Sequence, residues 1–306
     1  MWGWQIAVYL FLGGLAAGTF FFGALLQLAF GTRYLRTVRL SSALAVLFLL
    51  LGLVFLLIDV ARPLRALDLV HSFSNLGDSW MARGAWIIVA ALADYALFFL
   101  VSRFALGNDA GSFIPRNRGW ILNIIGMLGM LLSLLLAAYT GLLLRDAFAV
   151  SVWRTALIPA LFVVSALETG LAVVITCLRV REMPAAPLTR LLPQFEGAML
   201  VFFVMEFALI VRYAIWLMDA GASAAFIVQL LHEPRWIALF AGVAAVLILA
   251  AAASVVALVR TLRTRRDGNG GAAAVLPTLS LAGGFLLRAC VLALGVEFAL
   301  QASFLL

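Results

Sequence analysis

The sequence predicts an all-α integral membrane protein with eight transmembrane helices. Of its 306 residues, 66% are hydrophobic and 11% are charged, and the mean hydropathy is +1.15. A water-soluble domain cannot build a polar surface from this composition. The apolar residues form long stretches, and about 20 such residues suffice for a helix to cross the hydrocarbon core. The expected spans are residues 4–30, 40–60, 81–104, 118–144, 152–178, 195–218, 236–259 and 278–303.

The ends of the spans follow from local residues. The chain opens with Met-Trp-Gly-Trp and lacks a basic region and a small-residue cleavage site there, so we interpret this segment as the first span and not a signal peptide. The second span is expected to end before Pro63, because proline ends or bends a helix. The other prolines lie in or beside connections, and only Pro159 is expected inside a span. Transporter helices are often broken at the midplane, so this pattern argues against a solute transporter.

The arginines predict the orientation, since the chain contains no lysine. The connections after the first, third, fifth and seventh spans carry Arg33, Arg36, Arg39, Arg103, Arg116, Arg118, Arg179, Arg181, Arg190, Arg260, Arg263, Arg265 and Arg266. The other connections carry Arg62, Arg65, Arg83, Arg145, Arg154 and Arg235. The positive-inside rule then places both termini on the periplasmic side of a bacterial cytoplasmic (inner) membrane. The net charge of +7 therefore reflects topology, and no nucleic-acid partner is expected.

A weak internal repeat favours two four-helix bundles. Leu10-Phe11 leads to Gly18 in the first span, and Leu161-Phe162 leads to Gly170 in the fifth. We expect a single membrane domain over 1–306, built from a first bundle over 1–150 and a second over 151–306. Leu, Phe and Gly recur in any membrane protein, so a chance match is the alternative.

Residues that would hold a common redox cofactor are missing from the expected spans. His71 and His232 lie in or beside outer connections, whereas a membrane b-type haem needs imidazole ligands within the helices. Cys177 and Cys290 lie apart in apolar helices, which leaves no cradle for an iron–sulfur cluster. We expect no haem, no iron–sulfur cluster and no metal in this chain. An electron carrier would be a bound small molecule or a partner's cofactor.

The stretch over residues 57–86 concentrates polar side chains between two apolar spans. Ionisable groups at the edge of a bilayer are costly unless they are paired or functional. Asp59 and Arg62 are three residues apart and share a face if the helix continues. They either line a pocket, with Asp59 passing protons to the outer water, or form a salt bridge that closes the helix. Further candidates in this connection are Arg65, Asp68, His71 and Asp78.

Six segments in chain order carry a resemblance to a known family. They read GWQIAVYLFLGGLAAG, LIDVARPLRAL, SWMARGAW, AYTGLLL, LIPALFVVSALETG and GGFLLRACVL. Together they resemble the NrfD/PsrC family, which includes the membrane subunit of polysulfide reductase. The resemblance implies an eight-helix subunit that reacts with a quinone, either menaquinone or ubiquinone. It also implies docking of an extracytoplasmic iron–sulfur subunit, often with a molybdopterin catalytic subunit.

The resemblance and the residue chemistry together indicate a quinone site near the outer surface. Such a site needs hydrogen bonds to both carbonyl oxygens, an apolar cleft and groups that exchange protons. Tyr139 matches the family's quinone-side tyrosine, although an interfacial anchor is the alternative. Tyr9 lies at similar depth where some members have histidine, and tyrosine cannot become cationic as imidazole can. The predicted quinone-binding residues are Gln5, Tyr9, Asp59, Arg62, His71 and Tyr139.

A second group of ionisable residues falls within the spans. Each such residue costs a few kcal/mol on insertion scales. One hypothesis is a proton pathway between the inner water and the quinone site, and the competing one is static buried pairs such as Arg288 with Glu206. A proton- or ion-translocating subunit without its own quinone is a further alternative. The predicted pathway residues are Asp94, Glu168, Glu206 and Arg288 near the midplane, Glu196 toward the inner face and Glu297 toward the outer face, where Arg212 is expected as well.

Overall fold

Every regular element in the described part of the chain is a helix, which confirms the all-α prediction. The computed structural model describes residues 3–59, 80–104, 118–147, 150–182, 188–219, 226, 230, 232–264 and 272–304. Within these ranges the long helices are α1 (Trp4–Phe30), α2 (Leu35–Asp59), α4 (Trp80–Phe104), α5 (Arg118–Arg145), α6 (Leu157–Glu182), α7 (Leu188–Asp219), α9 (Pro234–Thr264) and α10 (Ala272–Phe304). Two 3₁₀ turns accompany them, η1 (Gly31–Tyr34) and η4 (Ser151–Trp153).

The long helices have the dimensions of membrane spans. The shortest have 25 residues and the longest has 33, and a rise of about 1.5 Å per residue makes even the shortest longer than a hydrocarbon core of about 30 Å. Seven stretches of the described chain are long and apolar enough to cross a membrane. The first of them, Trp4–Ile58, is 55 residues long and contains α1 and all of α2 except its last residue. The chain is therefore a multi-pass membrane protein.

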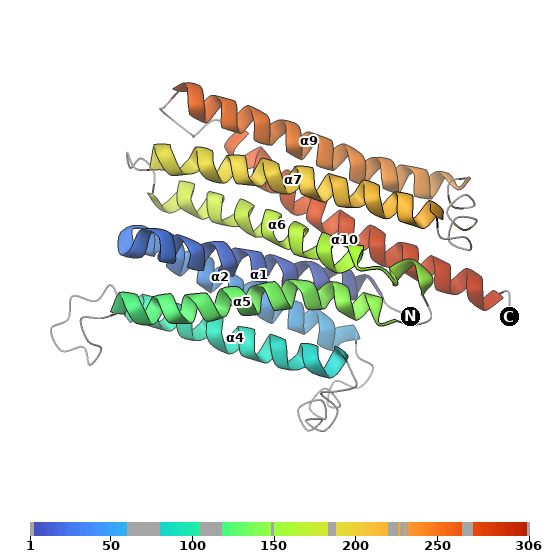
Figure 1. Cartoon of the computed structure of the whole chain (residues 1–306), viewed down its shortest axis with the longest axis horizontal. Coiled ribbons are helices and arrows are strands. Elements are labelled where there is room, and N and C mark those ends of the chain that lie inside the picture. The colour runs from blue at the N-terminus through green and yellow to red at the C-terminus, as the bar shows by residue number, and fades with distance from the viewer. Residues whose placement is uncertain are drawn as a thin grey trace.

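The turn between α1 and α2 depends on a glycine. Gly31 has a φ of 58° and its N–H bonds to the carbonyl of Gln27, so it ends α1 in the left-handed region that glycine tolerates best. The η1 turn then leads into α2, which packs along α1. Figure 1 shows the two blue helices side by side.

The helices form two neighbouring sets. α1, α2, α4 and α5 pack around one another, and so do α6, α7, α9 and α10. α1 and α6 lie against each other where the sets meet, and both chain termini lie at the same end of the molecule (Figure 1). The first set falls within 1–150 and the second within 151–306. That each set is a separate bundle produced by duplication stays a prediction, as does the side of the membrane on which the termini lie.

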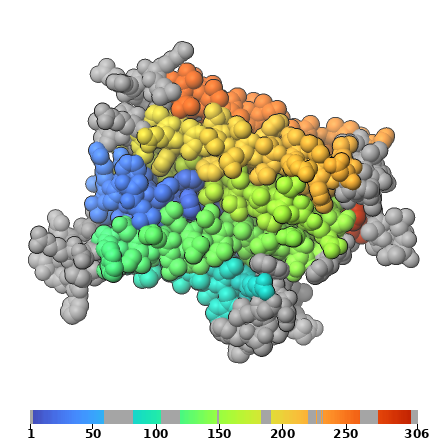
Figure 2. Space-filling view, in the orientation of Figure 1, coloured from blue at the N-terminus to red at the C-terminus, as the bar shows by residue number. Residues whose placement is uncertain are grey.

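Burial separates the central helices from the peripheral ones. In the most apolar 18-residue segment of α6, 78% is buried, whereas the corresponding share is 22% in α7 and 28% in α9. α1 is also an inner helix, because 17 of its 27 residues are buried; Figure 2 shows only part of it beside α5 and α6. Large apolar side chains such as Ile58, Ile124, Val204 and Ile248 are exposed on the outer helices. These surfaces suit contact with lipid tails.

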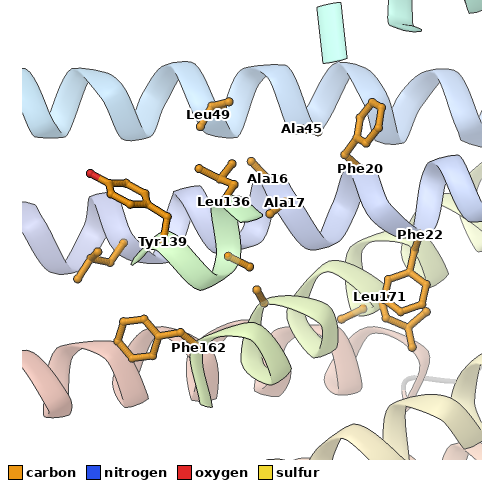
Figure 3. Packing of buried hydrophobic residues seen from close by; sticks show 14 of the residues in the cluster. Ala16, Ala17, Phe20, Phe22, Ala45, Leu49, Leu136, Tyr139, Phe162 and Leu171 are labelled. Atoms are coloured by element: carbon orange, nitrogen blue, oxygen red, sulfur yellow. The ribbon is translucent and has the colours of Figure 1, made fainter. Parts of the chain in front are cut away.

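The contact between α1 and α6 is a crossing of two backbones. A Cβ added to Gly18 would fall on the carbonyl oxygen of Ala166, and one added to Gly170 would fall on the backbone of Gly18. Small residues allow such close approach in membranes. Figure 3 shows Ala16 and Ala17 of α1 and Phe162 and Leu171 of α6 among the buried side chains between the helices. The two glycines of the suspected repeat are thus in direct contact.

Several predicted boundaries were wrong. The span expected over 40–60 begins at Leu35, and the one expected over 152–178 begins at Leu157 because residues 151–153 form the separate turn η4. Trp153 in that turn donates a hydrogen bond to the carbonyl of Val291 in α10 at 2.8 Å, which holds the turn against the second set of helices. Hydropathy could not reveal this anchor, since it depends on a contact distant in sequence.

The expectation that only Pro159 lies inside a span was also wrong. α7 and α10 begin at Leu188 and Ala272, ahead of the predicted 195 and 278, so that Pro193 and Pro277 lie inside them. Both prolines fall within the first two turns of their helices. The first N–H groups of a helix have no intrahelical partner, so a proline near the start removes few hydrogen bonds. The midplane segments of these helices contain no proline.

Candidate functional site

Two predicted tyrosines meet at the end of the molecule that holds the N-terminus. Tyr9 lies in the second turn of α1 and Tyr139 in the last turns of α5, and their exposed fractions are 2% and 4%. The two phenol groups interact with each other. The hydroxyl of Tyr9 nevertheless has no well-formed hydrogen bond to any described residue. A buried hydroxyl left without a partner is costly, so this position suits a ligand with a polar oxygen.

A glycine of α4 makes room for the ring of Tyr139. A Cβ added to Gly84 would overlap the ring carbons and hydroxyl of Tyr139. Figure 3 shows this ring directed from α5 toward α1. Gly84 belongs to the SWMARGAW segment, yet no pattern in that segment indicated its contact with Tyr139. An unexplained glycine inside a predicted span was the available signal.

The remaining predicted quinone residues are described only in part. Gln5 is partly buried one turn before Tyr9. Asp59 is the last residue of α2, and its side chain lies outside the described residues, as do Arg62 and His71. The softer candidates Arg65, Asp68 and Asp78 fall outside them as well. The roles of all these residues stay predictions.

Three charged residues meet in the middle of the second set of helices. Glu168 of α6, Glu206 of α7 and Arg288 of α10 are fully buried. Each lies near the centre of its helix. Arg288 interacts electrostatically with both carboxylates. We call these three residues the buried charge cluster.

Arg288 is held by neutral acceptors. Its Nη1 donates to Ser165 Oγ at 3.1 Å and to the carbonyl of Gly284 at 2.9 Å, and its Nη2 donates to the carbonyl of Phe162 at 3.3 Å. The guanidinium also lies 5.8 Å from the ring centre of Phe11 and 5.3 Å from that of Phe162. Aromatic faces at this distance attract a cation. The arginine is therefore fixed without direct contact to a carboxylate.

The two glutamates of the cluster are incompletely bonded. Neither oxygen of Glu168 or Glu206 has a well-formed hydrogen bond to a described residue. No ion pair within 4.0 Å joins either of them to Arg288 in that part of the chain. The pair of Arg288 with Glu206, the example given above for a static buried pair, is thus not a contact pair among the described residues. The charges act on each other over a longer distance.

Glu196 and Glu297 occupy different surroundings from the cluster. Glu196, near the start of α7, pairs with Arg179 of α6 at 2.5 Å, and both side chains are almost fully buried. Glu297, near the end of α10, is 21% exposed and lies 3.3 Å from Arg235 of α9. Figure 1 shows these helix ends at opposite ends of the molecule. Arg212, which the sequence placed toward the same face as Glu297, is exposed on α7.

Asp94 lies apart from the buried charge cluster, in the first set of helices. It is 7% exposed on α4, and its carboxylate lies against Gly129 of α5. Its Oδ2 has no hydrogen-bond partner within the described ranges. The adjacent Tyr95 bonds Ser133 at 2.7 Å and stacks on Phe20 of α1. The predicted pathway residues therefore fall into separate places and do not form one chain of contacts.

The Arg288 guanidinium packs directly against Gly14 of α1. A Cβ added to Gly14 would lie 2.5 Å from Arg288 Nη2, whereas the nearest atom to one added to Gly13 lies at 3.8 Å. The sequence pattern Gly14-x-x-x-Gly18 indicated close helix approach but not a buried arginine. Gly14 therefore links the helix that carries Tyr9 to the buried charge cluster.

We expect Gly14→Ala to lower the free energy of unfolding by about 1–3 kcal/mol, because the displaced guanidinium loses charge-assisted hydrogen bonds. Gly13→Ala is the matched control, since it makes the same change one residue earlier and creates only ordinary contact. Thermal denaturation of the purified variants measures the difference. Equal stability of the two would show that Arg288 is not held by Gly14.

Comparison with known proteins identifies the family. The family model described as "Polysulphide reductase, NrfD" matches residues 1–299. One of the polysulfide reductase chains of Wolinella succinogenes is 28% identical over 191 residues, which is 56% of the present sequence and 56% of that protein. Protein NrfD of Escherichia coli is 28% identical over 203 residues, 60% of the present sequence and 61% of that protein.

A third relative comes from a different reductase. One of the selenate reductase subunits of Mesobacillus selenatarsenatis is 25% identical over 199 residues, covering 57% of the present sequence and 47% of that protein. The chain thus spans about half of the length of the curated relatives it matches. Because the family model covers nearly all of the sequence, this chain belongs to the NrfD polysulphide reductase family.

Proposed function

We propose that this chain is the quinone-reactive membrane subunit of a respiratory oxidoreductase complex. It would exchange electrons between menaquinone or ubiquinone and an extracytoplasmic iron–sulfur subunit, with a molybdopterin or other catalytic subunit beyond it. The observation that carries the proposal is the buried pair Tyr9 and Tyr139, in which the Tyr9 hydroxyl lacks a hydrogen-bond partner among the described residues. The similarity to components of polysulfide and selenate reductases supports membership of such a complex.

The proposed topology has eight crossings in the bacterial cytoplasmic membrane, with both termini in the periplasm. The 55-residue apolar stretch Trp4–Ile58 is too long for one crossing, and, apart from the last residue of α2, it contains two helices of 27 and 25 residues that pack along each other. Counting α1 and α2 separately gives the eighth crossing. The excess of arginine in alternate connections supports the orientation. The outer surface would then hold the 61–80 and 219–235 connections, where we place the docking of the iron–sulfur subunit.

The tyrosines have the chemistry that a quinone requires. A neutral phenol donates one hydrogen bond and accepts others, so one tyrosine of the pair can donate to a carbonyl oxygen while it accepts a hydrogen bond from the other. Apolar side chains next to them, such as Ile6 and Leu136, offer contact to an isoprenoid tail. Gln5, Asp59, Arg62 and His71 are the proposed polar partners and proton exchangers at the outer edge. The quinone itself supplies the redox chemistry.

A proton pathway through the second set of helices is part of the proposal. Glu196 and Glu297 lie toward opposite ends of the bundle, with Glu168, Glu206 and Arg288 between them. Asp94 would serve the first set of helices. The unpartnered oxygens of Glu168 and Glu206 support this role, because such groups can accept or release a proton. The same observation favours the second candidate function, a proton- or ion-translocating subunit without its own quinone.

We expect Tyr139→Phe to weaken quinone binding to the purified complex by about tenfold, the equivalent of one hydrogen bond of about 1.4 kcal/mol. Tyr34→Phe is the matched control, because it removes the hydroxyl of a buried tyrosine in η1, at the opposite end of α1. Gly84→Ala should weaken binding as well, by displacing the Tyr139 ring. Titration of the complex with a quinone analogue measures the affinity. Unchanged affinity in Tyr139→Phe would favour the subunit without a quinone site.

A further inference from the structure

We propose that the buried charge cluster holds one exchangeable proton, shared between Glu168 and Glu206, with Arg288 as its fixed counter-charge. The inference rests on the proton pathway proposed above and gives that pathway a place and a capacity. It does not depend on quinone binding at Tyr9 and Tyr139.

Among the described residues, no charged group outside the cluster is found to act on its three side chains. All three side chains have an exposed fraction of 0%. Among the described residues, the titratable groups that act on Glu168 are Glu206 and Arg288, and Arg288 interacts with both glutamates. α1 packs against the cluster through Gly14 and Phe11, which carry no charge. The protonation of the cluster is therefore decided within these three residues.

Charge balance fixes the number of protons. Two ionised carboxylates and one guanidinium sum to a single negative charge, and an uncompensated charge in a dry interior is costly. Arginine does not lose its proton in proteins, so the balance comes from the glutamates. One proton on either glutamate makes the cluster neutral. A second proton would leave Arg288 uncompensated, which is costly for the same reason.

Two serines allow the proton to reside on either side. Ser165 accepts a hydrogen bond from Arg288 and lies close to Glu206, while Ser280 of α10 lies close to Glu168. The Ser280 hydroxyl has no well-formed partner among the described residues. A hydroxyl can donate to an ionised carboxylate or accept from a protonated one by rotation. The two protonated forms thus have similar surroundings, which suits a shared proton.

Infrared absorption of protonated carboxyl groups tests the proposal on the full chain in its complex, in lipid nanodiscs. An Asp94→Asn background removes the buried carboxyl of the first set of helices, one oxygen of which has no hydrogen-bond partner among the described residues. On this background we expect a carboxyl band that shifts in D₂O and titrates as one group. Either Glu168→Gln or Glu206→Gln should abolish the whole band, because the remaining carboxylate is then balanced by Arg288. Arg288→Gln should double it.

Other outcomes would overturn the shared proton. If each glutamine variant removed only half of the intensity, both glutamates would be protonated independently. If neither variant changed the band, or if the band did not shift in D₂O, the cluster would hold no exchangeable proton. The amplitude of the carboxyl band in the Asp94→Asn protein, in which the cluster is unchanged, gives the number of protons per cluster. This measurement remains available even where a further variant does not fold. Quinone affinity, measured on the same preparations, reports separately on the proposed quinone site.

Discussion

Gly18→Leu is expected to prevent the two sets of helices from packing and to remove most of the folded protein. The first atom of any side chain at Gly18 would fall on the Ala166 carbonyl of α6. Backbone cannot rotate away as a side chain can, so α1 and α6 would have to separate along their central contact. Overpacking of cores costs about 1–3 kcal/mol and occasionally more, and a clash with backbone places this variant at the upper end or above.

Gly242→Leu is the matched control for this change. Gly242 lies within α9, and no described atom lies within 4 Å of a Cβ added there. Size-exclusion chromatography and thermal denaturation of both variants in detergent would compare the folded fractions. We expect Gly242→Leu to behave as wild type. If Gly18→Leu were as well folded as the control, the close crossing of α1 and α6 would be refuted.

The fold was predictable because its cause is composition. A bilayer leaves helices as the way to satisfy the backbone of an apolar chain, so the long helices could be placed from hydropathy alone. Their ends could not, because they depend on contacts distant in sequence. Trp153 illustrates this limit, since its bond to Val291 holds the turn η4 apart from α6. Pro193 illustrates another, because a helix tolerates proline in its early turns.

The site was predictable in depth but not in its contacts. Glu168, Glu206 and Arg288 are rare charges in apolar spans, so the sequence indicated their burial, and the structure places them together. Which neutral groups hold Arg288 depends on helix rotation, which hydropathy does not specify. The glycines that make room for these side chains are visible in the sequence, but a glycine alone does not indicate which side chain lies against it. Gly14 and Gly84 are ordinary residues of a membrane sequence until a guanidinium and a phenol are seen to occupy the space of their missing side chains.

The two sets of helices differ in the chemistry they contain. The first holds the tyrosine pair and Asp94, while the second holds the buried charge cluster. α1 belongs to the first set but touches the cluster through Gly14 and Phe11, five and two residues beyond Tyr9. A change in what Tyr9 binds would therefore reach the cluster along less than two turns of one helix. This short path is the physical basis on which quinone chemistry and proton occupancy could be coupled.

Arg288→Met is expected to destabilise the protein by about 3–5 kcal/mol, the usual cost of removing one partner from a buried charge group. Methionine fills a similar volume, so the loss comes from charge, with protonation of the second glutamate limiting it. Arg212→Met is the matched control, because Arg212 is exposed on the surface of α7, so its loss leaves no buried carboxylate without a counter-charge. Adding Glu206→Gln to Arg288→Met should restore part of the stability, since the carboxylate that lost its counter-charge is then gone. Thermal denaturation of the three variants measures these differences. An equal loss of stability in Arg288→Met and Arg212→Met would show that Arg288 does not balance the buried glutamates. The absence of any recovery in the double variant would show the same.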